Sequence, residues 1–427
     1  MSNDLHKTDS VPTVSPSAGL DGCLDELDPE LRQLSLSIWI RPELAYEEFD
    51  AHDVLTAFLE NKGLTVTRHY CLPTAYLAEY RSPGYDPALH PTIAYLSEYD
   101  ALPQIGHACG HNLIAIAGVA ASLGCRRLME DSRKAGEALP ERVEGRILCV
   151  GCPAEETTGG KIDLLMMDAF SSVDFCMMVH PYGYNIAEPE ILGLLECEVE
   201  IHGNELDAGL SPWECGAAAT DCAVLLYSSL SLLRRTLQPG NQIHGVILEA
   251  GRPQSNRKSF AKLHFYLRTR TTLAMDRLKA FFFKALQSVA DLYDCTFETK
   301  FAEDPFEGLV SNNAMARVYR KYGELLGLQF PRLPPTWGST DMGNVSNAVP
   351  SIHPFFAIGD PSLTLHTKDF QVASGTPEAH QATVQVAKVI ALVGFDLLRD
   401  KSLQAACKTD FYNSPASSSR NRSVRPE

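Results

Sequence analysis

Apolar residues recur along this chain at two spacings that alternate with each other. Residues 28–38 and 47–62 place apolar side chains every three or four positions, which predicts amphipathic helices. Short apolar runs between helical stretches predict buried strands at 64–70, 92–96, 145–150 and 175–179. Because strands that alternate with helices pair in parallel, the pattern predicts an α/β fold, with a mostly parallel sheet covered on both faces.

The middle of the chain follows a different order. Its segments predict strand, helix, strand, strand, helix and strand at 194–202, 220–237, 242–248, 262–269, 276–293 and 296–301. This order is that of the ferredoxin-like α+β sandwich. We therefore expect a discontinuous main domain at 19–192 and 305–410, interrupted by an inserted domain at 193–304. The polar segments 1–18 and 411–427 lack apolar periodicity and are predicted to be disordered tails.

The composition limits the kinds of partner. The 427-residue chain has a net charge of −16, which argues against nucleic acid or an anionic membrane surface, since both bind basic patches. No apolar run approaches the ~20 residues of a membrane span.

Twelve cysteines at irregular spacing are typical of free thiols in a reducing cytosol, so we expect a cytoplasmic protein. Cys149 and Cys152 form a CxxC pair, but without a second pair we expect no metal or redox role.

Polar clusters follow several of the predicted strands. Asp100 comes shortly after the run 92–96, Glu155 and Glu156 follow 145–150, and His180 follows 175–179. His366 comes after a later apolar segment, 351–358. Each cluster alone has an ordinary structural explanation: the glutamate pair, for example, could simply favour the N-terminus of a helix. Their joint position is more informative, because ligands bind at the carboxyl ends of strands in open α/β sheets.

The stretch "IGHACGHN" at 105–112 adds a thiol and an imidazole to these clusters. Alone it could be a buried thiol beside a core histidine. Soft and borderline donors suitable for two Zn²⁺-like ions are supplied by Cys109, His111, Glu156, His180 and His366. Glu155 could then act as general base on a metal-polarised water, which is metal-assisted hydrolysis. Asp100 is a candidate to orient a histidine ligand.

These motifs resemble those of the zinc amidohydrolases and metallopeptidases that include aminoacylase, carboxypeptidase G, auxin-conjugate hydrolases, aminobenzoyl-glutamate hydrolases and cytosolic β-alanyl dipeptidases. The matching pieces are "RPELAYEE" (41–48), "SEYDALPQIGHACGHN" (97–112), "GCPAEETTGGK" (151–161), "VHP" (179–181), "GSTDMGNVS" (338–346) and "HTKDF" (366–370). The resemblance implies a catalytic domain interrupted by a lid domain that commonly forms a homodimer. It also implies that Cys109 bridges two metals, that His111, Glu156, His180 and His366 complete the ligand set, and that Glu155 is the base beside Asp100.

The inserted domain departs from the family pattern at two positions. Asp207 stands where the family has a histidine that stabilises the oxyanion, and Ser255 stands where it has a substrate-binding asparagine. Arg268, in the next predicted strand, still fits a role in binding the substrate carboxylate. Losing one oxyanion donor typically costs ~10²–10³ in rate, although His202, His244 or Arg257 could replace it.

The sequence therefore predicts a metal-dependent hydrolase that cleaves an amide bond in a dipeptide or N-acyl amino acid. Zinc is the expected cofactor, with two ions per chain, and manganese or cobalt are alternatives. The expected partners are a small amide substrate and a second copy of the chain, with neither nucleic acid nor membrane. Two other interpretations stay open: repurposed amide chemistry in a specialised (secondary-metabolite) pathway, or an inactive metal-binding homologue.

Overall fold

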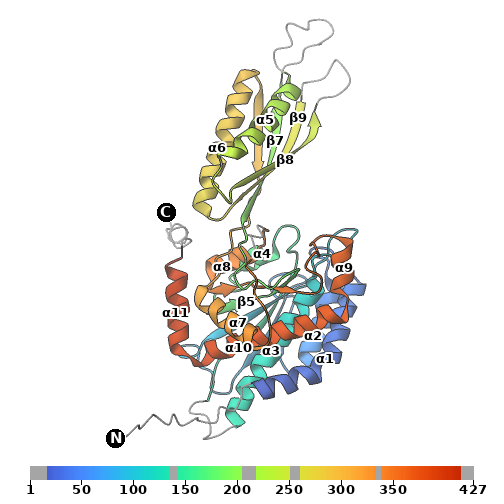
Figure 1. Cartoon of the computed structure of the whole chain (residues 1–427), viewed down its shortest axis with the longest axis vertical. Coiled ribbons are helices and arrows are strands. Elements are labelled where there is room, and N and C mark those ends of the chain that lie inside the picture. Colours follow the sequence, from blue (N-terminus) through green and yellow to red (C-terminus); the bar gives the residue numbers. More distant parts are fainter. Residues whose placement is uncertain (1–16, 135–141, 204–217, 251–259, 333–337, 415–427) are drawn as a thin grey trace, which may run out of the picture.

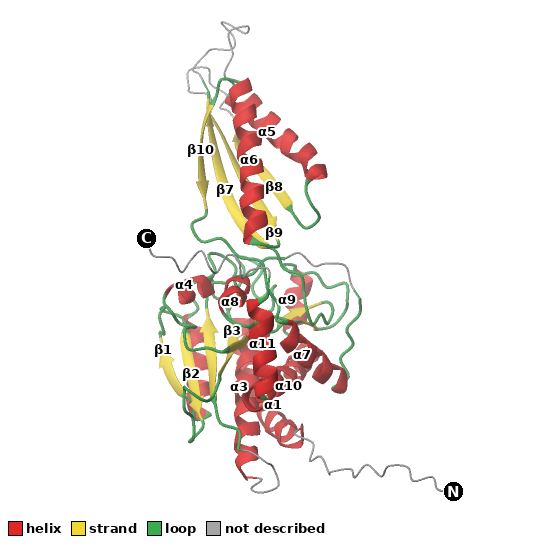
Figure 2. Ribbon diagram, turned by 90° about the vertical axis from the view of Figure 1, so that its left-hand side faces the viewer, coloured by secondary structure: helices red, strands yellow, loops and turns green. Residues whose placement is uncertain are grey.

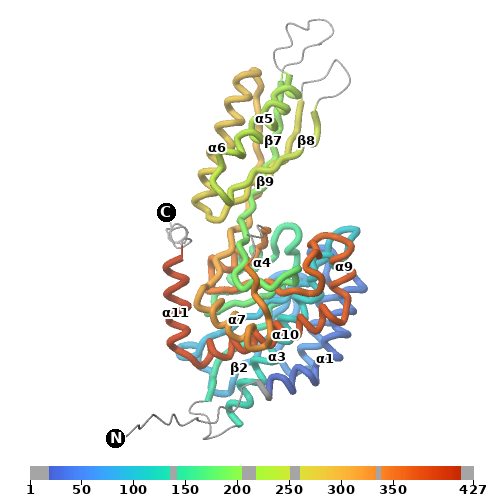
Figure 3. Tube along the Cα trace, viewed as in Figure 1, coloured from blue at the N-terminus to red at the C-terminus, as the bar shows by residue number. Residues whose placement is uncertain are grey.

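The chain forms a large α/β unit and a smaller α+β unit that projects from it (Figure 1). The structure is a computed structural model that describes residues 17–134, 142–203, 218–250, 260–332 and 338–414. The chain passes between the units twice, and the two connections lie side by side (Figure 3). Leu194 and Phe306 join them through paired backbone hydrogen bonds of 2.8 and 3.0 Å.

The large unit is built on a six-stranded sheet with the order β1-β2-β4-β3-β5-β11. Its strands are β1 (Thr65–Arg68), β2 (Tyr76–Arg81), β4 (Arg146–Cys152), β3 (Thr92–Glu98), β5 (Phe175–Met177) and β11 (Ser351–Ile352). The last four pair in parallel, while β1 and β2 are antiparallel additions at one edge. A separate parallel pair joins β6 (His180–Tyr182) to β12 (Phe355–Ala357). The mostly parallel sheet expected from the sequence is therefore present, although β2 was not predicted.

Helices cover both faces of this sheet (Figure 2). Alternate residues of β3 enter different cores: Ile93 and Tyr95 pack in one, and Ala94 and Leu96 pack in the other. The first core includes residues of α1 (Ser17–Ile40), α3 (His111–Lys134) and α10 (Pro377–Arg399), and the second those of α4 (Gly160–Met166) and α8 (Met342–Ala348). The other helices of this unit are α2 (Phe49–Asn61), α7 (Asn313–Leu325), α9 (Lys368–Ser374) and α11 (Lys401–Tyr412).

The smaller unit has its own four-stranded antiparallel sheet, in the order β10-β7-β9-β8. It is formed by β7 (Gly193–His202), α5 (Ala219–Leu233), the 3-10 turn η2 (Arg234–Thr236), β8 (Gln242–Ala250), β9 (Phe260–Thr269), α6 (Thr272–Leu292) and β10 (Thr296–Phe301). Every second residue of β7 from Leu195 to Ile201 is buried in a core shared with both helices. This is the inserted ferredoxin-like unit that the sequence predicted.

Two expectations about the chain need correction. Helices α3 and α10 reach the length and composition of a membrane span, but 89% and 72% of the most apolar window of each are buried inside the protein. Such burial is what core helices of a folded domain show. In addition, α1 begins at Ser17 and α11 continues to Tyr412, so each enters a segment that was expected to be a tail. Residues 1–16 and 415–427 lie outside the described residues.

Candidate metal centre

The predicted site residues meet at the carboxyl edge of the parallel strands. Strands β3 and β4 pair in register from Thr92 with Arg146 to Glu98 with Cys152. The chain segments that leave them therefore start side by side. Asp100 lies two residues beyond the end of β3, and Glu155 and Glu156 lie in the turn after β4.

Gly110 allows the thiol and imidazole of the 109–111 segment to approach His180. Its φ is +80°, and a Cβ added there would lie 2.6 Å from Pro181 Cγ. Such a contact is far too short, and the left-handed backbone favours glycine. The chain enters α3 directly after this turn, so His111 is the first residue of a buried helix. The result is a separation of 3.4 Å between Cys109 Sγ and His180 Nε2.

The five predicted ligands form two groups that share Cys109. Cys109, His111 and His180 form one group, and Cys109, Glu156 and His366 form the other, with ligand atoms within 4.8 Å of one another in each. Glu156 Oε1 lies 3.5 Å from His366 Nε2 and 3.8 Å from His111 Nε2. Ligands bound to zinc at about 2.1 Å in a tetrahedron are about 3.4 Å apart. The spacing therefore fits a shared metal ion.

Two orphaned atoms test this fit independently. His111 Nε2 and Glu156 Oε1 are buried and have no hydrogen-bond partner among the described residues. Leaving such groups unsatisfied costs about 1–3 kcal/mol each, and more if they are charged. A divalent cation between them would satisfy both atoms. The residues present therefore fit a divalent metal ion.

Hydrogen bonds on the far side of the His111 and His180 imidazoles fix their orientation. His111 Nδ1 lies 2.9 Å from Asp100 Oδ1, while the other oxygen of Asp100 accepts the Glu156 backbone N–H at 3.0 Å. His180 Nδ1 lies 2.7 Å from the carbonyl oxygen of Pro181. If each Nδ1 carries its proton, as these acceptors require, the Nε2 lone pairs face the other ligands. Asp100 thus sits where an orienting residue belongs.

Burial sets the charges of the metal-free cluster. It raises the pKa of the Cys109 thiol well above its ordinary value and lowers the pKa of His180 to about 3. Burial, followed by the carboxylates of Glu98 and Glu156, raises the pKa of Glu155 well above 4.5. Metal binding therefore requires the Cys109 thiol to lose its proton.

Glu155 belongs to neither of the two groups that contain Cys109, although it forms a further group with His111 and Glu156. Its Oε2 lies 4.0 Å from His111 Nε2, and the residue is 8% exposed. Its neighbour Glu156 lies closer to both histidines, with Oε1 3.5 Å from His366 Nε2 and 3.8 Å from His111 Nε2. Glu156 is therefore the better ligand candidate, because it alone of the two also joins a group with Cys109, and Glu155 is the candidate to act on a water.

The structure also brings in residues that had no predicted role. Glu48, Glu98, Lys161 and Asp341 are all fully buried around the cluster. Each belongs to one of the motifs that carried the family resemblance, which was the available signal. Nothing in the sequence showed that the side chains of these distant segments meet.

The lid positions are only partly within the described residues. Arg268 on β9 reaches the large unit, where its Nη1 donates to Ser339 Oγ at 2.6 Å. His202 packs against Phe260, and His244 hydrogen-bonds Gln242, so neither contacts the cluster. Asp207, Ser255 and Arg257 lie outside the described residues.

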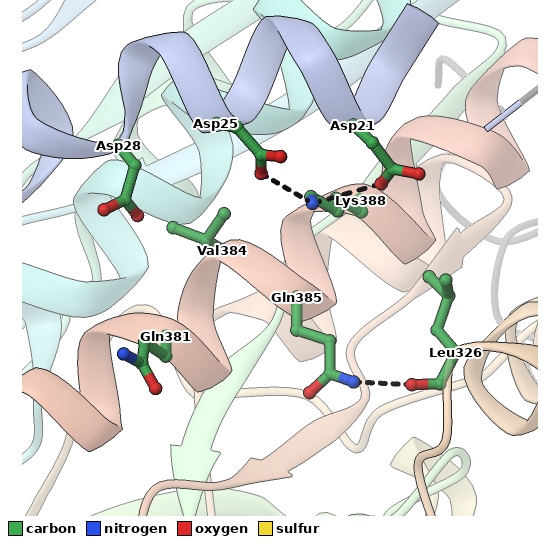
Figure 4. A pocket seen from close by; sticks show the side chains of 8 residues that line it. All are labelled: Asp21, Asp25, Asp28, Leu326, Gln381, Val384, Gln385 and Lys388. Carbon is green, nitrogen blue, oxygen red and sulfur yellow. Dashed lines mark hydrogen bonds and ion pairs between the residues drawn. The ribbon is translucent and has the colours of Figure 1, made fainter. Parts of the chain in front are cut away.

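A hollow between α1 and α10, away from this cluster, has different chemistry (Figure 4). Its lining is Asp21, Asp25, Asp28, Leu326, Gln381, Val384, Gln385 and Lys388. Lys388 Nζ lies 3.1 Å from Asp21 and 3.2 Å from Asp25, and His380 pairs with Asp28 at 2.9 Å. The acidic groups are therefore paired internally, and none of them belongs to the cluster at the sheet edge.

An α/β sheet that gathers a thiol, imidazoles and carboxylates at metal-ligand spacing has the arrangement of a metal-dependent hydrolase. The chain is 37% identical over 403 residues to the human Xaa-Arg dipeptidase, covering 91% of this chain and 90% of that protein. It is 24% identical to a p-aminobenzoyl-glutamate hydrolase polypeptide of Escherichia coli, covering 87% and 90% of the two chains. No family model matches the chain.

A solved structure shares the fold. It is a dinuclear metal-binding peptidase of the M20 family from Bacillus subtilis, with a TM-score of 0.62 and 16% identity over 86% of this chain and 99% of the other. The chain belongs to the M20 family of metallopeptidases and amidohydrolases. The predicted fold, family and reaction class are confirmed: the protein is a divalent-metal-dependent hydrolase of amide bonds in dipeptides or N-acyl amino acids.

Proposed function

We propose that this protein is a dipeptidase that cleaves the peptide bond before a basic C-terminal residue, arginine above all. The human relative, an Xaa-Arg dipeptidase by its name, supports this substrate class because it aligns along nearly the whole chain. The net charge of −16 supports it too, since a negative protein attracts a cationic substrate.

We further propose two zinc ions per chain, with manganese or cobalt as alternatives. The observation that carries this proposal is the convergence of the orphaned His111 Nε2 and Glu156 Oε1 on two ligand groups that share Cys109. A thiolate common to both groups is suited to bridging. When bound, the metal would lower the pKa of a water and polarise the scissile carbonyl.

The chain's own residues carry out the remaining steps. Glu155 accepts the proton of the attacking water and returns it to the leaving amine, as a general base and then a general acid. Asp100 holds His111 in the tautomer that leaves Nε2 free. Arg268 binds the substrate's C-terminal carboxylate, for which its position at the junction of the two units is suited. The roles of Asp207 and Ser255 stay predictions.

We also propose a cytoplasmic homodimer that forms through the small unit. Among the described strands β8 pairs only with β9, which leaves one edge of β8 open. Val246, Ile247 and Leu248 on β8 are exposed, as are Val224 and Leu232 on α5. We call these five residues the lid face. Open strand edges with apolar side chains favour pairing with another chain.

The described cysteines are all free, which supports the proposed location in a reducing compartment, the cytoplasm.

The test is hydrolysis of a matched panel by the zinc-loaded wild type and by Glu155→Gln. Ala-Arg, Ala-Lys, Ala-Leu, Ala-Glu and aminobenzoyl-glutamate differ mainly in the charge of the C-terminal side chain or in the acyl group. We expect the highest kcat/KM for Ala-Arg and a loss of about 10²–10⁴ in kcat for Glu155→Gln. Preference for the acidic substrates would overturn the basic-residue assignment, and wild-type inactivity on the whole panel would overturn the dipeptidase proposal.

A further inference from the structure

Lys161 places a buried cation next to the metal centre. It lies in the first turn of α4, five residues after Glu156, and is fully buried. Its ammonium group contacts Glu98 from β3 and Asp341 from the segment before α8, and its backbone N–H donates to Asp341 Oδ2 at 2.9 Å. Burial alone would lower the pKa of Lys161, but the carboxylates of Asp341 and Glu98 raise it well above its usual value. Lys161 is therefore charged at neutral pH.

The carboxylates around Lys161 have the arrangement of a metal site. One oxygen from each of Glu98, Glu155 and Asp341 lies within 4.8 Å of the others. We call these three residues the carboxylate cage. The second oxygen of Glu98 is buried without a hydrogen-bond partner among the described residues and lies 3.8 Å from His111 Nε2, so the cage borders the first ligand group directly.

Lys161 contacts two members of the cage and leaves the third unengaged. Its ammonium group bonds Glu98 and Asp341, while Glu155 accepts no hydrogen bond from a described residue. A divalent ion in the cage would be expected to bind all three carboxylates, because hard cations take as many oxygen ligands as the site offers. Glu155 would then be a ligand and lose its freedom to take a proton from water.

We propose that Lys161 is a built-in cation that occupies the carboxylate cage, excludes a further metal ion from it and so keeps Glu155 available as the base. The ammonium group of Lys161 bonds Glu98 and Asp341 and neither Glu155 nor the ligand candidates, so we assign it as a positioning residue. The inference rests on the proposed role of Glu155. It also explains why a lysine, rather than an apolar residue, is buried here, since three carboxylates without a cation would repel one another strongly.

The test is the number of tightly bound divalent ions in Lys161→Met, which removes the ammonium group but keeps most of the side-chain volume. Wild type and variant are loaded with Mn²⁺, freed of excess by gel filtration and measured by elemental analysis. We expect one more Mn²⁺ per chain in Lys161→Met than in wild type. We also expect kcat to fall by about 10²-fold or more, as when a general base is lost, with little change in KM.

The matched control is Lys161→Met/Glu98→Gln. It removes one positive and one negative charge, so the cage and residue 161 together keep the wild-type net charge but supply only two carboxylates. We expect the wild-type Mn²⁺ count and a kcat at least about ten-fold above that of Lys161→Met, because Glu155 is free again. If Lys161→Met does not fold, this double variant decides the question: a wild-type metal count with a kcat as low as that of Glu155→Gln would overturn the proposal.

An unchanged Mn²⁺ count in folded Lys161→Met, with kcat within about three-fold of wild type, would also overturn it, because a lost base costs far more. The metal count keeps this result separate from failure of the proposed function. Wild-type protein that turns over no dipeptide would refute the function, whereas the extra ion in the variant is measured without any substrate.

Discussion

Glu48 Oε1 accepts the backbone N–H of Ala154 at 2.9 Å, across 106 residues of sequence. Ala154 has a φ of +59°, the left-handed region that costs a residue with a Cβ about 1–2 kcal/mol. The other oxygen of Glu48 accepts the Thr74 hydroxyl at 2.7 Å, which holds the carboxylate in place. Because Glu155 follows Ala154 directly, Glu48 fixes the peptide from which the base projects.

Shortening Glu48 should therefore reduce catalysis. In Glu48→Ala the Ala154 N–H loses its acceptor, and the strained turn can relax, which moves Glu155. We expect kcat to fall by about 10²-fold, the loss typical of a 1 Å misplacement. Glu48→Gln keeps an oxygen for Ala154 and an amide for Thr74, so its kcat should stay much closer to wild type. Steady-state kinetics on Ala-Arg compare the three proteins.

Glu43→Ala is the matched control for this prediction. Glu43 also accepts two backbone N–H groups, those of Asp50 and Ala51 at 2.9 Å, but it does so at the start of α2. Its loss should cost about 1 kcal/mol of stability, as for a helix cap, with kcat unchanged. Equal losses of kcat in Glu43→Ala and Glu48→Ala would show that general destabilisation, and not the position of Glu155, is responsible.

The Glu48 carboxyl group should make the free energy of unfolding of the metal-free protein depend on pH. Burial raises the pKa of Glu48 from 4.5 to about 7, partly opposed by the Thr74 hydrogen bond and reinforced by Asp100. Between these values the folded state binds one proton more than the unfolded state, so the free energy of unfolding falls as pH rises. Over the full interval the difference is about 3 kcal/mol.

Glu48→Gln cannot ionise and should lack this contribution. Urea denaturation at pH 5 and pH 8, after treatment with a chelator, gives the free energy of unfolding of both proteins. We expect wild type to lose up to about 3 kcal/mol relative to Glu48→Gln between these two pH values. If the free energy of unfolding changes with pH equally in the two proteins, the raised pKa assigned to Glu48 is wrong.

The sequence predicted the secondary structure and the donor set because each depends on local patterns. The strands around the site are short apolar runs, and their polar ends carry the chemistry. It missed β2 (Tyr76–Arg81) because that strand pairs antiparallel with both of its neighbours and so stands outside the strand–helix alternation of the parallel strands. The carboxylate cage was missed for a different reason: Glu98, Lys161 and Asp341 meet only through the three-dimensional packing of β3, α4 and the segment before α8.

The two histidines of "IGHACGHN" show the same limit. By spacing alone either could bind a metal. His107 turns away from the cluster, with its Nε2 3.1 Å from the carbonyl oxygen of Ile38, whereas His111 faces Glu156. Which of the two histidines faces the cluster depends on the backbone turn at Gly110. The glycine suggests a turn, but the sequence alone does not give the direction of that turn.

His111 and His107 therefore form a matched pair for testing the metal site. Replacing each by glutamine removes an imidazole from a fully buried position in the same segment. We expect His111→Gln to lose tightly bound zinc, measured by elemental analysis after dialysis, and to lose the increase in Tm that zinc gives wild type. His107→Gln should keep the wild-type zinc content even if its Tm falls. Zinc lost equally from both variants would contradict the assignment of His111.

Arg268 should act on the substrate's carboxylate. Arg268→Met removes a charge-assisted contact of about 1.5–3 kcal/mol, so kcat/KM for Ala-Arg should fall by about 10- to 100-fold. The loss should disappear for Ala-Arg amide, which has no C-terminal carboxylate. Arg270, two residues further on, pairs with Glu190, and Arg270→Met is the control that should behave like wild type with both substrates.

The lid face should hold two copies of the chain together. Ile247→Glu and Leu248→Lys place charges on the open edge of β8, where Ile247 is 37% and Leu248 56% exposed. Charged residues on an edge strand oppose pairing with another strand. We therefore expect the double variant to be monomeric by light scattering at concentrations where wild type is dimeric. Leu292→Glu is the control, because Leu292 is 70% exposed but lies at the end of α6, outside the lid face. A dimer that survives the double variant and dissociates in Leu292→Glu would place the interface elsewhere on the small unit.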